Sequence, residues 1–246
     1  MDRSLYVAMT GATQMMRAQS EVAHNLANAD TVGFKAQMSA FQALPVQGPG
    51  LPTRINGVAL GEGVDMRGGG QIETGRELDV AVQGDGWIAV QSADGSEAYT
   101  RAGNLQLTAD GLLTDTRGNP VLGDGGPISI PQSSQLNIGA DGTISAVPMG
   151  QTPDTIAAIG RIKLVNPPAN QLALGSDGLM HLAGGSNAEA DPAVTMKSGV
   201  LENSNVNPSQ TLVQMIQLSR QYELQIKAIK SADDNAQSAT RLLQMT

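Results

Sequence analysis

The sequence predicts an α+β fold. A mainly β, antiparallel central domain is flanked by long N- and C-terminal α-helices that pair in a discontinuous, coiled-coil-like bundle. Residues 36–206 hold 27 of the 29 glycines and 11 of the 12 prolines, which favours helix at both ends and turn-rich structure between them. Apolar residues at both ends recur at alternating spacings of three and four, the period of a helix that packs on another helix. Six Asp-Gly dipeptides interrupt the middle, and this pair suits a two-residue hairpin turn.

The N-terminal helix is expected over about residues 2–28. It is predicted to stop between Asn28 and Gly33, where the residue types tolerate turn geometry. Its packing face takes every third and fourth residue: Leu5, Ala8, Ala12, Met15, Gln19, Val22 and Leu26.

The C-terminal helix is expected to begin after Asn207, an N-cap residue followed by Pro208 at the first helical position. It is expected to run to about residue 243, roughly 54 Å at 1.5 Å per residue. The predicted packing face comprises Leu212, Met215, Ser219, Tyr222, Ile226, Ile229, Asp233, Ala236, Thr240 and Leu243.

The chain is divided by these patterns into four segments. They are an N-terminal helix (1–35), an extended Gly- and Pro-rich arm (36–75), an antiparallel β domain (76–202) and a C-terminal assembly helix (203–246) that packs with 1–35. Short runs rich in Val, Ile, Leu and Thr predict the strands of the β domain. These candidate strands are 78–83, 87–91, 98–101, 105–108, 111–114, 128–130, 143–147, 156–165 and 179–182.

Composition excludes several classes of function. The chain has no cysteine, so it has no disulfide, thiolate metal site or Cys nucleophile. A net charge of −8 with 2% aromatic residues argues against nucleic-acid binding. No apolar run approaches the roughly 20 residues of a membrane span, and the N-terminus lacks the features of a conventional signal peptide.

Motifs for chemistry are largely absent. There is no phosphate-binding loop and no Gly-x-Ser-x-Gly elbow, and turn chemistry accounts for the Asp-Gly pairs without calcium. A Ser/His/Asp triad is not excluded by composition, but His181 is expected on a strand face and His24 on the first helix. Trp87 is expected to be a core anchor. We therefore expect no enzyme activity, no cofactor and no catalytic or metal-binding residues.

Two long terminal helices in a chain of this size favour assembly, because a single pair buries its apolar faces poorly. Charge follows the same division: the ends are nearly neutral, and residues 36–206 carry a net −9. The alternative is that both helices fold back onto the β domain.

Several motifs together resemble the bacterial flagellar basal-body rod and hook family, most closely its proximal-rod members. The resemblance extends over nearly the whole chain. The segments that carry it are Met1-Asp2-Arg3-Ser4-Leu5-Tyr6-Val7-Ala8-Met9-Thr10-Gly11-Ala12, His24-Asn25-Leu26-Ala27-Asn28-Ala29-Asp30-Thr31-Val32-Gly33-Phe34-Lys35, Val82-Gln83-Gly84-Asp85-Gly86-Trp87, Ala98-Tyr99-Thr100-Arg101-Ala102-Gly103-Asn104-Leu105, Gly199-Val200-Leu201-Glu202-Asn203-Ser204-Asn205-Val206, and Met215-Ile216 through Arg220-Gln221-Tyr222-Glu223. The sequence departs from the family at His24, where Asn is usual, and at Asp30, where Ser is frequent.

The resemblance implies a structural subunit of the proximal rod, located in the periplasmic part of the basal body. Such a subunit polymerises into the axial tube that transmits torque and conducts exported subunits. The implied partners are copies of the chain, neighbouring rod proteins and the flagellar type III export apparatus, which exports it without a cleaved signal peptide. Neither nucleic acid nor membrane insertion is implied.

The expected assembly interface comprises Leu5, Ala8, Ala12, Met15, Val22, Leu26, Asn25, Asn28, Gly33, Phe34, Leu212, Met215, Tyr222, Ile226, Ile229, Ala236 and Leu243. The alternatives are a distal-rod member of the same family, a periplasmic cell-wall-active enzyme and an adhesin-like binding module.

Overall fold

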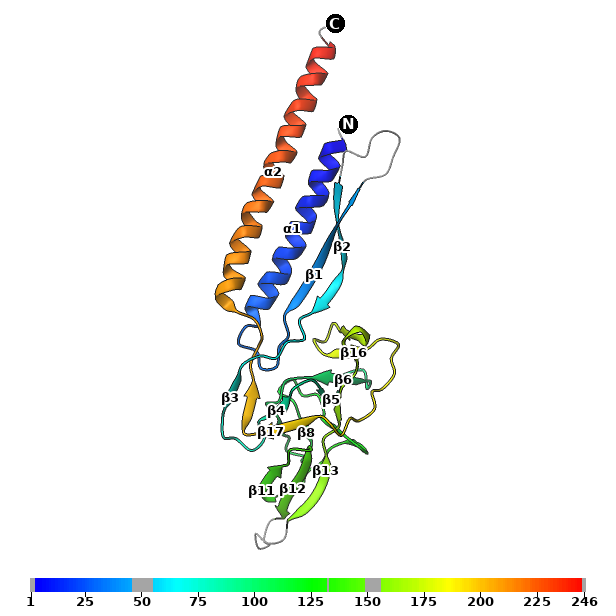
Figure 1. The fold of residues 1–246 in the computed structure, drawn as a ribbon, viewed down its shortest axis with the longest axis vertical. Helices are drawn as coiled ribbons and strands as arrows, with labels where there is room; N and C mark the ends of the chain where they lie inside the picture. The colour runs from blue at the N-terminus through cyan, green and yellow to red at the C-terminus, as the bar shows by residue number, and fades with distance from the viewer. Residues whose placement is uncertain (1–2, 46–54, 132, 149–155, 245–246) are drawn as a thin grey trace. The chain divides into compact units, whose positions relative to one another are not determined.

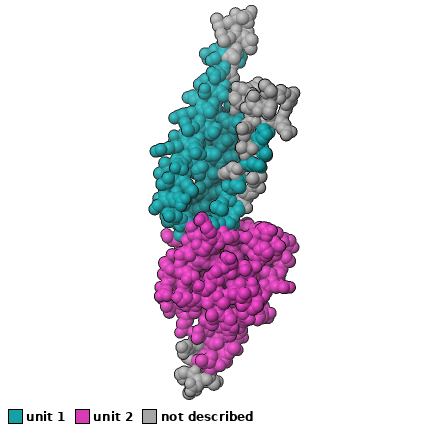
Figure 2. Space-filling model, in the orientation of Figure 1, with its two compact units in different colours: residues 1–29, 36–65, 206–246 teal, residues 30–35, 66–205 magenta. Residues whose placement is uncertain are grey.

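The computed structural model of the chain describes residues 3–45, 55–131, 133–148 and 156–244. The chain divides into two compact units (Figure 2). Unit 1 comprises residues 1–29, 36–65 and 206–246, and unit 2 comprises residues 30–35 and 66–205. The chain therefore passes from one unit to the other after residues 29, 35, 65 and 205.

Unit 1 is built on two helices, α1 (Arg3–Ala27) and α2 (Pro208–Gln244), which lie side by side in opposite directions (Figure 1). The predicted pairing of the terminal helices is confirmed. At about 1.5 Å per residue their lengths are about 38 and 56 Å. Asn207 caps α2: its Oδ1 accepts a hydrogen bond from the Gln210 amide at 3.2 Å, and its carbonyl accepts one from the Thr211 hydroxyl at 2.8 Å. Residue 2, where the first helix was expected to begin, lies outside the described residues.

Residues 36–75, expected as an extended arm, contain regular strands. Strands β1 (Gln37–Pro45) and β2 (Ile55–Val64) form an antiparallel pair that lies along α1 in unit 1 (Figure 1). Strand β3 (Gln71–Glu73) belongs to unit 2. The Gly-rich segment has a low β-propensity, but it still forms strands because β1 and β2 hydrogen-bond to each other's backbone N–H and C=O groups.

Unit 2 is antiparallel throughout its described strands. A five-stranded sheet has the order β14-β5-β6-β16-β15, and a three-stranded sheet has the order β11-β12-β13. Two-stranded pairs are β17-β4, β18-β3, β7-β8 and β10-β9. The strands are β4 (Val80–Gln83), β5 (Trp87–Gln91), β6 (Glu97–Thr100), β7 (Gln106–Leu107), β8 (Leu113–Thr114), β9 (Leu122–Gly123), β10 (Gly126–Pro127), β11 (Ser133–Ile138), β12 (Thr143–Pro148), β13 (Ala157–Arg161), β14 (Leu164–Val165), β15 (Leu172–Leu174), β16 (Met180–Leu182), β17 (Thr195–Ser198) and β18 (Val200–Glu202).

Five of the six Asp-Gly pairs lie between two strands that pair with each other, as the turn chemistry predicts. The exception is Asp85-Gly86, which joins β4 to β5. Those strands pair with β17 and β6 instead, so this turn changes sheet.

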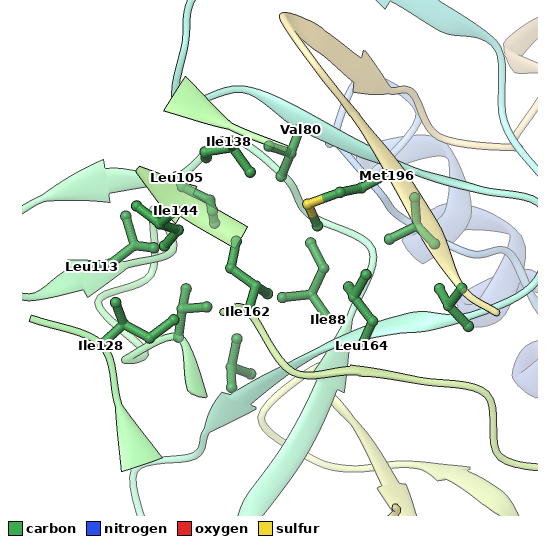
Figure 3. Packing of buried hydrophobic residues seen from close by; sticks show 14 of the residues in the cluster. Val80, Ile88, Leu105, Leu113, Ile128, Ile138, Ile144, Ile162, Leu164 and Met196 are labelled. Atoms are coloured by element: carbon green, nitrogen blue, oxygen red, sulfur yellow. The ribbon is translucent and has the colours of Figure 1, made fainter. Parts of the chain in front are cut away.

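The core of unit 2 is a single cluster of aliphatic side chains contributed by most of its sheets. Figure 3 shows Ile88 of β5, Ile144 of β12 and Val80 of β4 among the labelled side chains of this cluster, and all three are fully buried. Trp87 is also buried, at 6% exposed, as expected for a core anchor. The core is therefore buried and apolar, and it provides a closely packed base for the polar groups described below.

Truncating this core should cost unit 2 much of its stability. Ile144→Ala should lower the free energy of unfolding by about 2–5 kcal/mol, because a fully buried side chain leaves a cavity. Ile156 is 66% exposed, so Ile156→Ala should change it by less than about 0.5 kcal/mol. Urea denaturation of the two variants measures both, and equal losses would contradict the packing.

Candidate functional site

The predicted packing face of α1 is turned inward within unit 1. Ala12 is buried, and the other positions of the face are partly buried. A methyl group added at Gly11 would lie 3.2 Å from the side chain of Gln225, so the two helices approach closely at this point. The α1 residues expected in the assembly interface therefore already contribute to packing within one subunit.

The predicted face of α2 splits into two. Met215, Tyr222 and Ile229 are partly buried, whereas Leu212 and Ile226 are 48% and 43% exposed. The side chains of Ala236 and Leu243 lie outside the described residues. The split has a geometric reason: one partner helix covers only a narrow stripe of a helix that is 37 residues long.

Exposed apolar residues also lie outside the predicted faces. Tyr6, Met9 and Met16 share one side of α1 by their spacing and are at least half exposed. On α2 the corresponding residues are Val213, Ile216 and Leu224. Large exposed apolar side chains grouped on an element mark a surface for another protein. Their spacings of three, seven and eight residues can be read in the sequence, but they compete with the stronger pattern of the inward faces.

The asparagines at the end of α1 and just after it make contacts within their own chain. Asn25 binds the backbone of Gln37 twice: its Nδ2 donates to the carbonyl at 2.8 Å, and its Oδ1 accepts from the amide at 2.8 Å. Asn28 donates its Nδ2 to the His24 carbonyl at 2.9 Å. Asn25 thus ties the end of α1 to the start of β1.

Gly33 lies in unit 2 and has a φ of +68°, where L side chains are strained. Its amide donates to the Glu202 carbonyl at 2.7 Å. A Cβ here would lie 2.3 Å from the amide nitrogen of Ala102. The next residue, Phe34, accepts a hydrogen bond from the Asn205 amide at 3.3 Å. Only glycine therefore fits at residue 33, where the chain passes close to the backbone of β18 and of Arg101-Ala102.

The carboxylate of Glu202 lies at the centre of a buried polar cluster. The Lys35 ammonium donates to its Oε1 at 2.7 Å, the Gly69 amide donates to the same oxygen at 2.9 Å, and Arg101 Nη1 donates to Oε2 at 3.0 Å. The Lys35, Arg101 and Glu202 side chains are all at least 95% buried. We call these four residues the Glu202 junction. It brings together the N-terminal, central and C-terminal motifs of the sequence.

Each cation of the junction has a second attachment. Lys35 Nζ also donates to the Arg67 carbonyl at 2.8 Å, and Arg101 Nη2 donates to the Gly84 carbonyl at 2.8 Å. The Arg101 guanidinium lies over the ring of Trp87, 5.4 Å from its centre. Burial by itself would raise the pKa of Glu202. The hydrogen bonds from Lys35 and Gly69 and the two positive charges outweigh that effect, so the pKa is lowered from its ordinary value.

The geometry around His181 does not form a catalytic triad. Ser92 Oγ donates to Asp177 Oδ2 at 2.7 Å, and His181 Nε2 lies 3.0 Å from the same oxygen. The carboxylate therefore stands between the hydroxyl and the imidazole, where a triad needs the imidazole beside the hydroxyl.

The described residues offer neither a metal site nor a membrane-spanning helix. They contain no group of three His, Asp or Glu side chains placed to hold a metal ion. No helix among them is both long and apolar enough to cross a bilayer.

Replacing Gly33 should be more harmful than replacing another glycine of similar conformation. Gly118 has a φ of +88° with open space around it, so Gly118→Ala should cost only the left-handed strain, about 1–2 kcal/mol. Gly33→Ala should cost more, because its Cβ also meets backbone atoms. Thermal unfolding of the two variants tests this difference, and equal melting temperatures would contradict it.

The Glu202 junction should make stability depend on pH below the ordinary glutamate pKa of 4.5. A lowered folded-state pKa contributes stability that is fully present above the unfolded value and is lost as pH falls through the folded one. Unfolding in urea over a pH series should therefore show a steeper acid loss for the natural chain than for Glu202→Gln. Parallel acid losses would argue against the ionised junction.

Family models match the two ends and the centre of the chain. Residues 5–35 match the flagella basal body rod protein model, and residues 81–146 match the flagellar hook protein FlgE/F/G D1 domain. Residues 197–242 match the C-terminal model of the flagellar basal body rod FlgEFG proteins. The first and last of these regions include Lys35 and Glu202, and the central one includes Arg101.

Similar proteins match over the full length. Two flagellar basal-body rod proteins FlgF, from Salmonella typhimurium and Escherichia coli, are each 46% identical over 100% of this chain and 100% of their own. A flagellar basal-body rod protein FlgG from Agrobacterium fabrum is 32% identical, with 98% of this chain and 99% of its own covered. With likeness at both ends, in the centre and over the whole length, this chain belongs to the family of flagellar basal-body rod proteins and is a structural subunit of that rod.

Proposed function

We propose that this chain is a proximal-rod subunit that polymerises with its own copies and with neighbouring rod proteins into the axial tube. The observation that carries this proposal is the full-length identity of 46% to two FlgF proteins, against 32–34% to several FlgG proteins. The likeness to these two FlgF proteins supports the proximal assignment over the distal one, while three further FlgF proteins, from other organisms, are 29–31% identical. In this role the chain transmits torque and lines the channel for exported subunits.

The helices of unit 1 supply the assembly surface. Tyr6, Met9 and Ile216 are at least half exposed in the single chain, although each has a large apolar side chain. Fully burying such a side chain contributes about 1.5–3 kcal/mol, so a few of them per contact suffice to drive association. The predicted inward faces of α1 and α2 then stabilise each subunit, while the outward residues join subunits.

The route of export and the lack of catalysis are part of the proposal. On the grounds of the family alone, we assign export to the flagellar type III apparatus without a cleaved signal peptide. The placement of Asp177 between Ser92 and His181 supports a role without catalysis. Assay of the pure chain on peptidoglycan tests the enzyme alternative directly, and turnover of the glycan would overturn the structural assignment.

The first experiment is electron microscopy of basal bodies from a strain that lacks this gene, with a swimming assay beside it. Rods truncated near the inner-membrane ring, without hooks and without swimming, are the expected result. Complete rods with hooks would overturn the proposal and favour the adhesin-like or enzymatic alternatives.

A charge on the outward side of α2 should block assembly. Ile226→Asp places a carboxylate on a side chain that is 43% exposed in the single subunit. It should weaken each contact more than about tenfold, since at least about 1.4 kcal/mol of apolar burial is lost. The readout is complementation of the deletion strain, together with the circular dichroism of the purified variant.

The matched control is Gln217→Asp, an exposed residue on the same helix whose replacement removes no apolar surface. It should restore swimming. Leu26→Asp should also block assembly and leave unit 2 folded, but it disturbs packing inside the subunit as well. Normal rods from Ile226→Asp would refute the assembly surface on α2.

A further inference from the structure

The Glu202 junction lies close to the points where the chain leaves unit 2. The chain passes between the units after residues 29, 35, 65 and 205. Lys35 is the last residue before the second of these points. Gly69 follows the third by four residues, and Glu202 precedes the fourth by three. One carboxylate therefore binds three connecting segments, and all of its partners belong to unit 2.

Backbone contacts hold the same three segments together. The Gly33 amide donates to the Glu202 carbonyl, and the Asn203 amide donates to the Gly70 carbonyl at 2.8 Å. Asn205 donates its Nδ2 to the Arg67 carbonyl at 3.1 Å. These connecting segments are therefore joined by main-chain hydrogen bonds as well as by the charged side chains.

The approach of the backbones is very close at Gly69. A Cβ at this residue would lie 1.9 Å from the Asn203 carbonyl oxygen. No other residue type fits there without moving a strand. The third segment is thus pressed against the C-terminal one at the point where its amide binds Glu202.

Arg101 connects this cluster to the core of unit 2. It binds Glu202 through Nη1 and the Gly84 carbonyl through Nη2, and it lies over the buried ring of Trp87. Trp87 begins β5, which lies between β14 and β6 in the five-stranded sheet. A pull on any of the connecting segments therefore reaches the sheet through short, charge-assisted hydrogen bonds.

We propose that the Glu202 junction is a mechanical anchor: it fastens three of the connecting segments to unit 2 at one point, so that force arriving along one segment is shared by all three. The anchor itself is a property of the single chain. Its role in carrying torque rests on the proposed function as a rod subunit.

The first test is hydrogen exchange of the full chain, read by mass spectrometry. In Lys35→Gln, exchange in residues 30–36 and 66–70 should be at least about tenfold faster, since local opening is no longer opposed by the charged pair. Strands β5 and β12 should keep their protection, because Arg101 still pairs with Glu202. Glu202→Gln should loosen both segments further.

The matched control is Glu73→Gln. Glu73 pairs with Lys197 at 3.1 Å in the same unit, but this pair is exposed and contributes little. Hydrogen exchange in the Glu73→Gln variant should match that of the natural chain. The anchor is overturned if Lys35→Gln behaves like this control, or if it loosens β5 as much as residues 30–36. If Glu202→Gln does not fold, Lys35→Gln decides alone.

The second test applies load in cells. A strain with Lys35→Gln should build rods and swim in dilute medium, and it should lose speed more steeply than the Glu73→Gln strain as viscosity rises. Identical dependence on viscosity, or the absence of rods, would overturn the role in torque. Complete rods in the deletion strain would instead remove the proposed function and leave the exchange result standing.

Discussion

The fold of unit 2 depends on the hydrogen bonds made to one buried carboxylate, that of Glu202. An ionised Glu202 in a buried site is strongly unfavourable unless its oxygens accept hydrogen bonds, and Lys35, Gly69 and Arg101 donate them. These donors are 167, 133 and 101 residues away in the sequence. The junction therefore joins segments that are far apart in the sequence, and it is complete only when all of them lie together in the folded unit.

Unit 1 follows the opposite logic. Its two helices pack on each other and on the β1–β2 strands, and its exposed residues include the apolar side chains of Tyr6, Met9 and Ile216. Apolar contacts are non-directional and depend on area, so they strengthen as subunits are added. A carboxylate cluster is directional and tolerates little displacement. Directional hydrogen bonds thus hold the three connecting segments of unit 2 together, whereas exposed apolar surface on unit 1 is available for association with other subunits.

Local patterns predicted much of the fold, because they are set by neighbours in the sequence. Asn207 and Pro208 fixed the start of α2, and β5 was predicted at its observed bounds, Trp87–Gln91. The strands β1 and β2 were not foreseen, since glycine and proline hide a ladder that depends on pairing. Strand β18 was missed because it is short and its main role, presenting Glu202, is decided by residues far away in the sequence. The inward face of α2 was foreseen at Met215 and Tyr222, but which residues remained outside depended on how little of the helix α1 covers.

The family motifs at the two ends thus combine two kinds of residue that sequence likeness cannot separate. The matched region 5–35 contains Tyr6 and Met9, whose side chains are exposed, and also Lys35, which is buried in unit 2. A residue that makes a contact inside the subunit must fit a fixed set of neighbours in a fixed geometry. Outward residues are constrained only by the apolar area that they offer a neighbour. Substitutions between apolar side chains should therefore be tolerated at Met9. At Lys35, by contrast, an uncharged residue removes one of the two positive charges that stabilise the buried Glu202 carboxylate.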